Sequence, residues 1–73
     1  MIKELTSQEA HAGRRMWTVS HIGGAYATRA DAVKAWEEAG KPRTQGSSVW
    51  TTLHILPEND TAWQTAKTVT IAP

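Results

Sequence analysis

The pattern of apolar and polar residues changes at Met16, and from that point it predicts strands and one helix. Residues 16–22 (MWTVSHI) have the β-branched and aromatic composition of a strand, and residues 23–24 (GG) supply the positive-φ positions of a two-residue hairpin turn. The return strand then covers residues 25–28, which places His21 opposite Tyr26. Paired residues share a face, so we expect these side chains on the core face: Trp17, Val19, His21 and Tyr26.

The clearest predicted element is a helix over residues 30–39 (ADAVKAWEEA). Thr28 precedes it as a capping residue with Asp31 three positions on, and Gly40 suits the left-handed position that follows a helix. Apolar residues at helical spacing form one stripe, which we expect to face the sheet: Ala32, Val33, Trp36 and Ala39.

Two further strands follow the helix. Residues 49–56 (VWTTLHIL) have strand composition, and residues 57–60 (PEND) are typical of a turn. Residues 61–72 alternate with a period of two and are rich in threonine, which favours a strand. A short helical turn over residues 60–66 before a brief strand is the alternative interpretation.

The element order ββαββ predicts an α+β fold with an antiparallel sheet and one helix packed on it. We expect a single small domain over residues 1–73, with the core in residues 16–72 and a polar arm in residues 1–15. In the arm, Thr6 can cap a short helical turn from Ser7 to His11. A loosely held arm is the other interpretation and is slightly favoured, because Gly13 interrupts any longer helix.

Composition narrows the classes of protein further. The 73 residues include four tryptophans and no cysteine, which excludes disulfides and thiolate metal sites. A formal net charge of +1 argues against a dedicated nucleic-acid binder, whose basic face dominates its charge count. The chain has no apolar run long enough to span a bilayer and no apolar stretch of a signal peptide, so we expect a cytoplasmic protein with no membrane partner.

The residues that carry chemistry do not form a recognisable catalytic or metal-binding pattern. The three histidines, His11, His21 and His54, fall in different segments without the spacing of a zinc site. No serine lies in a sharp GxSxG turn, and the glycine pair lacks the lysine of a phosphate-binding loop. We therefore expect no enzyme activity, no cofactor and no metal.

Trp50 and the basic residues are the candidates for binding a partner. The strand at residues 49–56 carries apolar side chains on both faces, and one helix covers only one of them. The other face then leaves an exposed apolar patch, which is typical of an interaction surface, unless the N-terminal arm covers it. Basic side chains form either a rim around the sheet or scattered solubilising charge: Lys3, Arg14, Arg15, Lys41 and Arg43.

Four stretches carry a resemblance to a known group of proteins: the start MIKELTSQEA, the pair Arg14-Arg15, the turn GGAYAT and the strand WTTLHIL. With the length and layout of the chain, they resemble the small host-takeover proteins of phages, in particular the RNA-polymerase-binding transcription regulator type of a lytic Xanthomonas phage. The resemblance implies binding to the N-terminal region of the host polymerase β′ subunit near the RNA exit channel. It also implies inhibition of initiation by σ-factor displacement, and antitermination with the help of NusA.

On this hypothesis we expect a monomer that contacts nucleic acid only through the polymerase complex. The candidate partner-binding residues are Ile2, Lys3, Glu4, Leu5, Arg14, Arg15, Lys41, Arg43 and Trp50. Two alternatives remain. One is another phage inhibitor of a host defence complex, of the anti-CRISPR or anti-restriction type, and the other is a small nucleic-acid-binding module.

Overall fold

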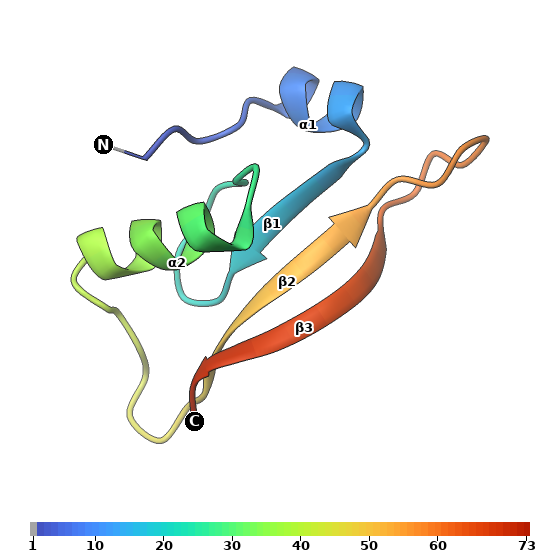
Figure 1. Ribbon diagram of the computed structural model, residues 1–73. Coiled ribbons are helices and arrows are strands. Elements are labelled where there is room, and N and C mark those ends of the chain that lie inside the picture. The colour runs from blue at the N-terminus through green and yellow to red at the C-terminus, as the bar shows by residue number, and fades with distance from the viewer. Residues whose placement is uncertain (1) are drawn as a thin grey trace.

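The computed structural model describes residues 2–73, which form two helices and one three-stranded antiparallel sheet in the order β1-β2-β3. The elements shown in Figure 1 are α1 (Ser7–Gly13), β1 (Arg15–Val19), α2 (Arg29–Glu38), β2 (Val49–Ile55) and β3 (Gln64–Ala72). The predicted α+β class is confirmed. The predicted order ββαββ is wrong, because the chain has one helix more and one strand fewer.

The strand that is missing belongs to the predicted N-terminal hairpin. β1 ends at Val19, and Tyr26 makes only an isolated bridge to Trp17, with two reciprocal N–H···O bonds of 2.8 Å. A tight two-residue turn of type I′ needs positive φ at both central residues, and of the two glycines only Gly24 has it, with φ 105°. The chain therefore makes a wider loop, and the predicted pairing of His21 with Tyr26 is wrong.

The helix α2 forms where the sequence predicts it. The Thr28 Oγ1 accepts a hydrogen bond from the Asp31 N–H at 3.1 Å, and Gly40 follows the helix with φ 94°. Capping at both ends satisfies backbone groups that a ten-residue helix otherwise leaves free. No helix within residues 2–73 is long and apolar enough to cross a membrane.

The core lies between α2 and one face of the sheet. Its buried side chains are Trp17, Val19, Tyr26, Ala32, Trp36 and Val49. The Trp36 Nε1–H donates to the Pro42 carbonyl oxygen at 2.8 Å, so the indole ring joins the helix to the connection that follows it. Thr51 is fully buried and donates its hydroxyl to the Val69 carbonyl oxygen at 3.2 Å, which links β2 to β3. His21, expected on this face, is exposed.

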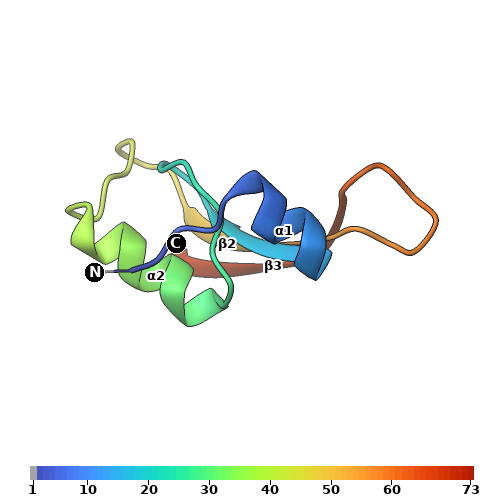
Figure 2. The same cartoon turned by 90° about the horizontal axis from the view of Figure 1, so that it is seen from above.

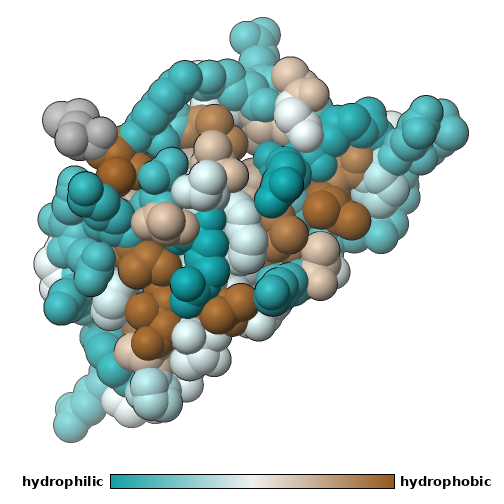
Figure 3. Space-filling model, in the orientation of Figure 1, coloured by the Kyte–Doolittle hydropathy of each residue, from teal (hydrophilic) through white to brown (hydrophobic). Residues whose placement is uncertain are grey.

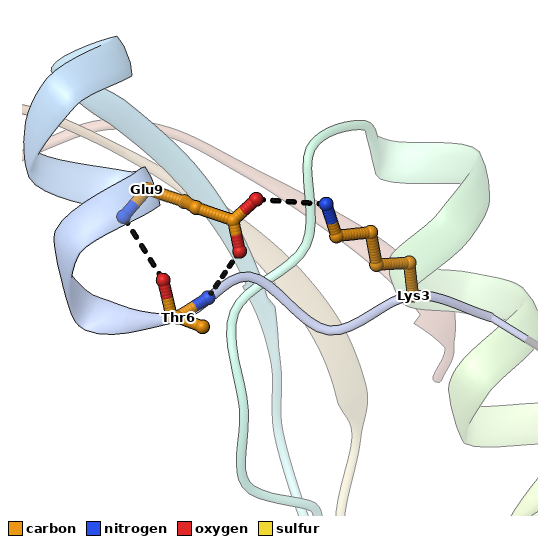
Figure 4. A network of polar contacts seen from close by, with 3 residues as sticks. All are labelled: Lys3, Thr6 and Glu9. Atoms are coloured by element: carbon orange, nitrogen blue, oxygen red, sulfur yellow. Dashed lines mark hydrogen bonds and ion pairs between the residues drawn. The ribbon is translucent and has the colours of Figure 1, made fainter.

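The N-terminal segment contains the short helix rather than the favoured loose arm. Thr6 and Glu9 form a capping box, with both side-chain-to-backbone bonds at 3.1 Å, and the Lys3 Nζ donates to the Glu9 carboxylate at 2.7 Å (Figure 4). Ala10 is buried, with 3% of its surface exposed. Seen from above, α1 and α2 lie on different sides of the strands (Figure 2).

The last strand starts later than predicted, at Gln64, and the helical alternative over residues 60–66 does not occur. Asp60 accepts hydrogen bonds from the Ala62 N–H and from the Gln64 Nε2, both at 3.0 Å. These bonds hold the residues immediately before β3 in a bend. The loop between β2 and β3 therefore projects from one end of the sheet (Figure 1). The molecule is flat, with principal extents of 40 × 25 × 16 Å.

Trp36 provides a test of this core. In Trp36→Phe the Pro42 carbonyl loses its donor, and we expect the free energy of unfolding to fall by about 1–2 kcal/mol. Urea denaturation followed by circular dichroism measures the change. The matched control Trp50→Phe alters an exposed ring and should cost less than about 0.5 kcal/mol. Equal losses in the two variants would show that the Trp36 bond does not stabilise the fold.

Candidate partner-binding surface

Trp50 lies on the sheet face opposite to α2. Side chains alternate along β2, so Val49 and Thr51 point into the core while Trp50 points away from it. Trp50 is 40% exposed, and only one other large hydrophobic residue within residues 2–73, Ile55 at 36%, is similarly exposed. On the face seen in Figure 3, hydrophobic and hydrophilic residues are interspersed without a single large apolar area.

Neighbouring groups fix the position of the Trp50 ring. The His21 ring meets it edge to face, with ring centroids 6.4 Å apart. Trp50 also exchanges two hydrogen bonds with Ser20: its N–H donates to the Ser20 Oγ at 3.1 Å, and its carbonyl oxygen accepts from the Ser20 N–H at 2.9 Å. His21 has φ 71°, and its Nε2 lies 3.2 Å from the Ser48 carbonyl oxygen. The indole is therefore held in place while much of its surface remains free.

The basic connection between α2 and β2 lies at the same end of the sheet. Arg43 donates from Nη2 to the Pro73 carbonyl oxygen at 2.8 Å and also to the Ser47 carbonyl oxygen, which ties the connection to the C-terminus. Lys41 is exposed. We call Trp50 and His21 together the Trp50 surface. Lys41 directly follows α2, with its N–H bonded to the Trp36 carbonyl oxygen, and therefore lies toward the opposite face of the sheet. His21 was not among the candidates, since nothing in the sequence indicates that a turn at residues 20–21 brings it beside Trp50.

The other predicted basic pair lies at the opposite end of β1 and β2. Arg14 donates from Nε to the Leu56 carbonyl oxygen at 3.0 Å and from Nη2 to the Pro57 carbonyl oxygen, so its guanidinium holds the end of β2. Arg15 is exposed and pairs with Ile55. The strand rise places Ile55 about 17 Å from Trp50, so one compact contact cannot include all the predicted basic residues.

The N-terminal candidates form a third group. Ile2 packs against the core, and the Leu5 N–H donates to the Ala25 carbonyl oxygen at 2.7 Å, so both have structural contacts. Lys3 and Glu4 are exposed. Lys3 is held by its ion pair with Glu9. The predicted site residues thus lie in three places, and only the end of the sheet that carries Trp50 has an exposed large aromatic side chain.

A hollow that sequence reasoning missed lies between α1, the N-terminal segment and β1. Its volume is about 340 Å³, at the lower end of the range for ligand pockets. Its walls include Leu5, Ala10, His11, Met16, Ala25 and Trp63. The His11 and Trp63 rings meet edge to face at 5.4 Å, which draws the loop before β3 toward α1. These contacts join residues far apart in sequence, so no local pattern indicates the hollow.

Local hydrogen bonding and burial shift the pKa values of three groups. The hydrogen bond from Lys3, followed by those from Thr6, lowers the pKa of Glu9 to about 2. Burial, with a smaller contribution from the charge of Glu4, raises the pKa of Tyr26. The backbone N–H of Ala62 lowers the pKa of Asp60. Within residues 2–73 no three His, Asp or Glu side chains come close enough to hold a metal ion.

Comparison with known proteins identifies no relative: no protein-family model, curated protein or solved structure matches this chain.

The capping network makes a prediction for pH. Because the folded pKa of Glu9 is about 2, below its ordinary value of 4.5, its contribution to stability is present above pH 4.5 and is lost as the pH falls through about 2. NMR titration of the Glu9 carboxyl carbon should show this pKa in the native chain and a higher one in Lys3→Met. Lys67→Met removes an exposed lysine elsewhere and should leave the pKa unchanged. A Glu9 pKa near 4.5 in the native chain would contradict the network.

Proposed function

We propose that this chain acts by binding a macromolecular partner through the Trp50 surface. The observation that carries the proposal is a tryptophan, Trp50, that is 40% exposed in a domain of 73 residues, with its backbone held by Ser20 and its ring in contact with His21. Tryptophan is enriched among residues that dominate binding energy, and a ring held in place loses little conformational entropy on binding. An exposed, fixed Trp50 therefore suits a role as a binding anchor.

The segment of the sequence that contains Trp50 indicates the chemistry of the partner. The connection and strand over residues 41–56 contain Lys41 and Arg43 and no Asp or Glu, although the whole chain is almost neutral. This local positive charge favours an acidic surface, and the indole needs an apolar recess within it. The net charge of +1 favours a protein partner over bare nucleic acid, whose binders carry a stronger basic excess.

The resemblance to phage host-takeover proteins makes bacterial RNA polymerase the first partner to test. On this proposal the chain contacts the N-terminal region of the β′ subunit near the RNA exit channel, in the cytoplasm of the host. It inhibits initiation by favouring σ-factor displacement and promotes antitermination with NusA. The support for this target is the resemblance of the sequence, together with a surface suited to an acidic protein.

A binding experiment with Trp50→Ala tests the proposal. Purified Xanthomonas RNA polymerase is titrated with the native chain, and complex formation is followed by co-elution and biolayer interferometry. Loss of the indole anchor should weaken binding at least about 30-fold, as expected for a dominant interface residue. The matched control is Ile55→Ala, which removes the other exposed hydrophobic group on the opposite sheet face and should leave affinity within about threefold.

Three outcomes would contradict parts of this proposal. The absence of a complex at about 10 μM would exclude polymerase as a functional partner of ordinary affinity. Equal weakening in Trp50→Ala and Ile55→Ala would exclude the Trp50 surface as the specific contact. Binding to single-stranded RNA alone, with affinity falling steeply as salt rises, would support the nucleic-acid module instead.

A further inference from the structure

The two edges of the sheet differ in how they are covered. At the β1 edge, Tyr26 bridges to Trp17, and the neighbouring Ala25 carbonyl oxygen accepts from the Leu5 N–H. At the other edge, β3 pairs with β2 and with no other segment of residues 2–73 (Figure 1). An open strand edge presents unpaired backbone N–H and C=O groups that can bind another strand.

The composition of β3 suits such pairing. The strand QTAKTVTIA has nine residues, is rich in threonine and other β-formers, and contains no proline. Six of the nine residues are exposed. Natural edge strands are often protected by charges, by proline, by β-bulges or by a covering segment. β3 has a single charged residue, Lys67, and irregular pairing only near its two ends, which leaves residues 67–70 in regular register.

The pairing of β2 fixes which backbone groups of β3 are free. The Ser20 N–H donates to the Trp50 carbonyl oxygen, so Trp50 directs its backbone groups toward β1. Directions alternate along a strand, so the next residue, Thr51, directs its groups toward β3. Thr51 pairs with Val69, so the N–H and C=O of Val69 point toward β2. The residues on either side of Val69, including Thr68, direct their N–H and C=O outward.

We propose that the β3 edge pairs with the β3 edge of a second copy of this chain, antiparallel and about a two-fold axis at Thr68. In this register Thr68 lies opposite its own copy, and the outward groups of Thr70 face Ala66 of the second copy. Irregularities in the pairing on either side of residues 67–70 shift the register of the strand ends, so the pairing is centred on these four residues. Each Lys67 lies opposite Val69 rather than opposite the other Lys67, which avoids direct like-charge pairing.

Charges at the two ends of β3 favour a second copy of this chain as the partner of the β3 edge. The loop before β3 carries Glu58 and Asp60, and Asp60 accepts from Gln64, which places that carboxylate level with the start of the strand. At the other end of β3, Arg43 donates to the Pro73 carbonyl oxygen. Antiparallel pairing brings the acidic end of each copy beside the basic end of the other.

The dimer would have one continuous six-stranded sheet. A two-fold axis perpendicular to the sheet keeps equivalent faces on the same side, so both Trp50 rings would lie on one face. This assembly differs from the monomer expected from the sequence. It involves the chain alone and does not depend on the identity of any other partner, so its test is separate from that of the Trp50 surface.

Hydrogen exchange on the native chain tests the pairing at single residues. We expect a concentration-dependent dimer by sedimentation over about 10 μM to 1 mM, the range of a small interface. By NMR, the amides of Thr68 and Thr70 should exchange at least about tenfold more slowly at the high than at the low concentration. The amide of Val69 bonds to β2 in both states and should change much less.

Substitutions at the edge provide the second arm. Thr68→Pro removes an outward N–H that the internal sheet does not use, which edge strands tolerate, and should abolish the dimer. Thr68→Val keeps this N–H and should preserve the dimer. Glu58→Lys should weaken the dimer, because it replaces an acidic side chain at the end of β3 that lies beside Arg43 of the second copy.

The proposal is overturned by a chain that stays monomeric at 1 mM, or by amides of Thr68 and Thr70 that exchange equally fast at both concentrations. It is also overturned if a folded Thr68→Pro variant, checked by circular dichroism, dimerises as tightly as the native chain. If Thr68→Pro does not fold, the exchange measurement on the native chain decides the question.

Discussion

Burial of α2 against the sheet is the constraint on which the rest of the structure depends. A domain of 73 residues without disulfides has one thin core, and here Trp17 and Trp36 supply much of its apolar volume. The helix can cover only one face of the sheet, above β1 and β2. The position of the exposed residues, including Trp50, follows from which side chains that helix can reach.

The opposite face is covered only in part. α1 and Trp63 cover the end of the sheet near Met16, and the capping box keeps α1 helical although it has only seven residues. Short helices are marginal on their own, so the bonds among Lys3, Thr6 and Glu9 and the burial of Ala10 are needed together. Cover from the arm is therefore present at one end of this face, while Trp50 is exposed toward the other end.

Exposed groups lie in two separate regions. The Trp50 surface exposes an aromatic side chain, while β3 exposes backbone groups and has an acidic residue at one end and Arg43 at the other. Contacts at the Trp50 surface would depend on side-chain chemistry, whereas contacts at the β3 edge would depend on the orientation of the backbone N–H and C=O groups. A small protein can use both at once, because the outer edge of β3 and the face that carries Trp50 do not compete for the same atoms.

The sequence by itself determined the elements that local physics controls. Capping by Thr28 and the apolar stripe with Trp36 define α2, and strand composition defines β2, because these signals depend on neighbouring residues alone. Only the tertiary structure decided that the glycine pair opens into a loop, since β1 finds its partner in β2, thirty or more residues away. The grouping of His21 with Trp50, and the use of Arg14 and Arg43 to hold distant carbonyl groups, likewise arise from contacts between remote segments, which no local pattern encodes.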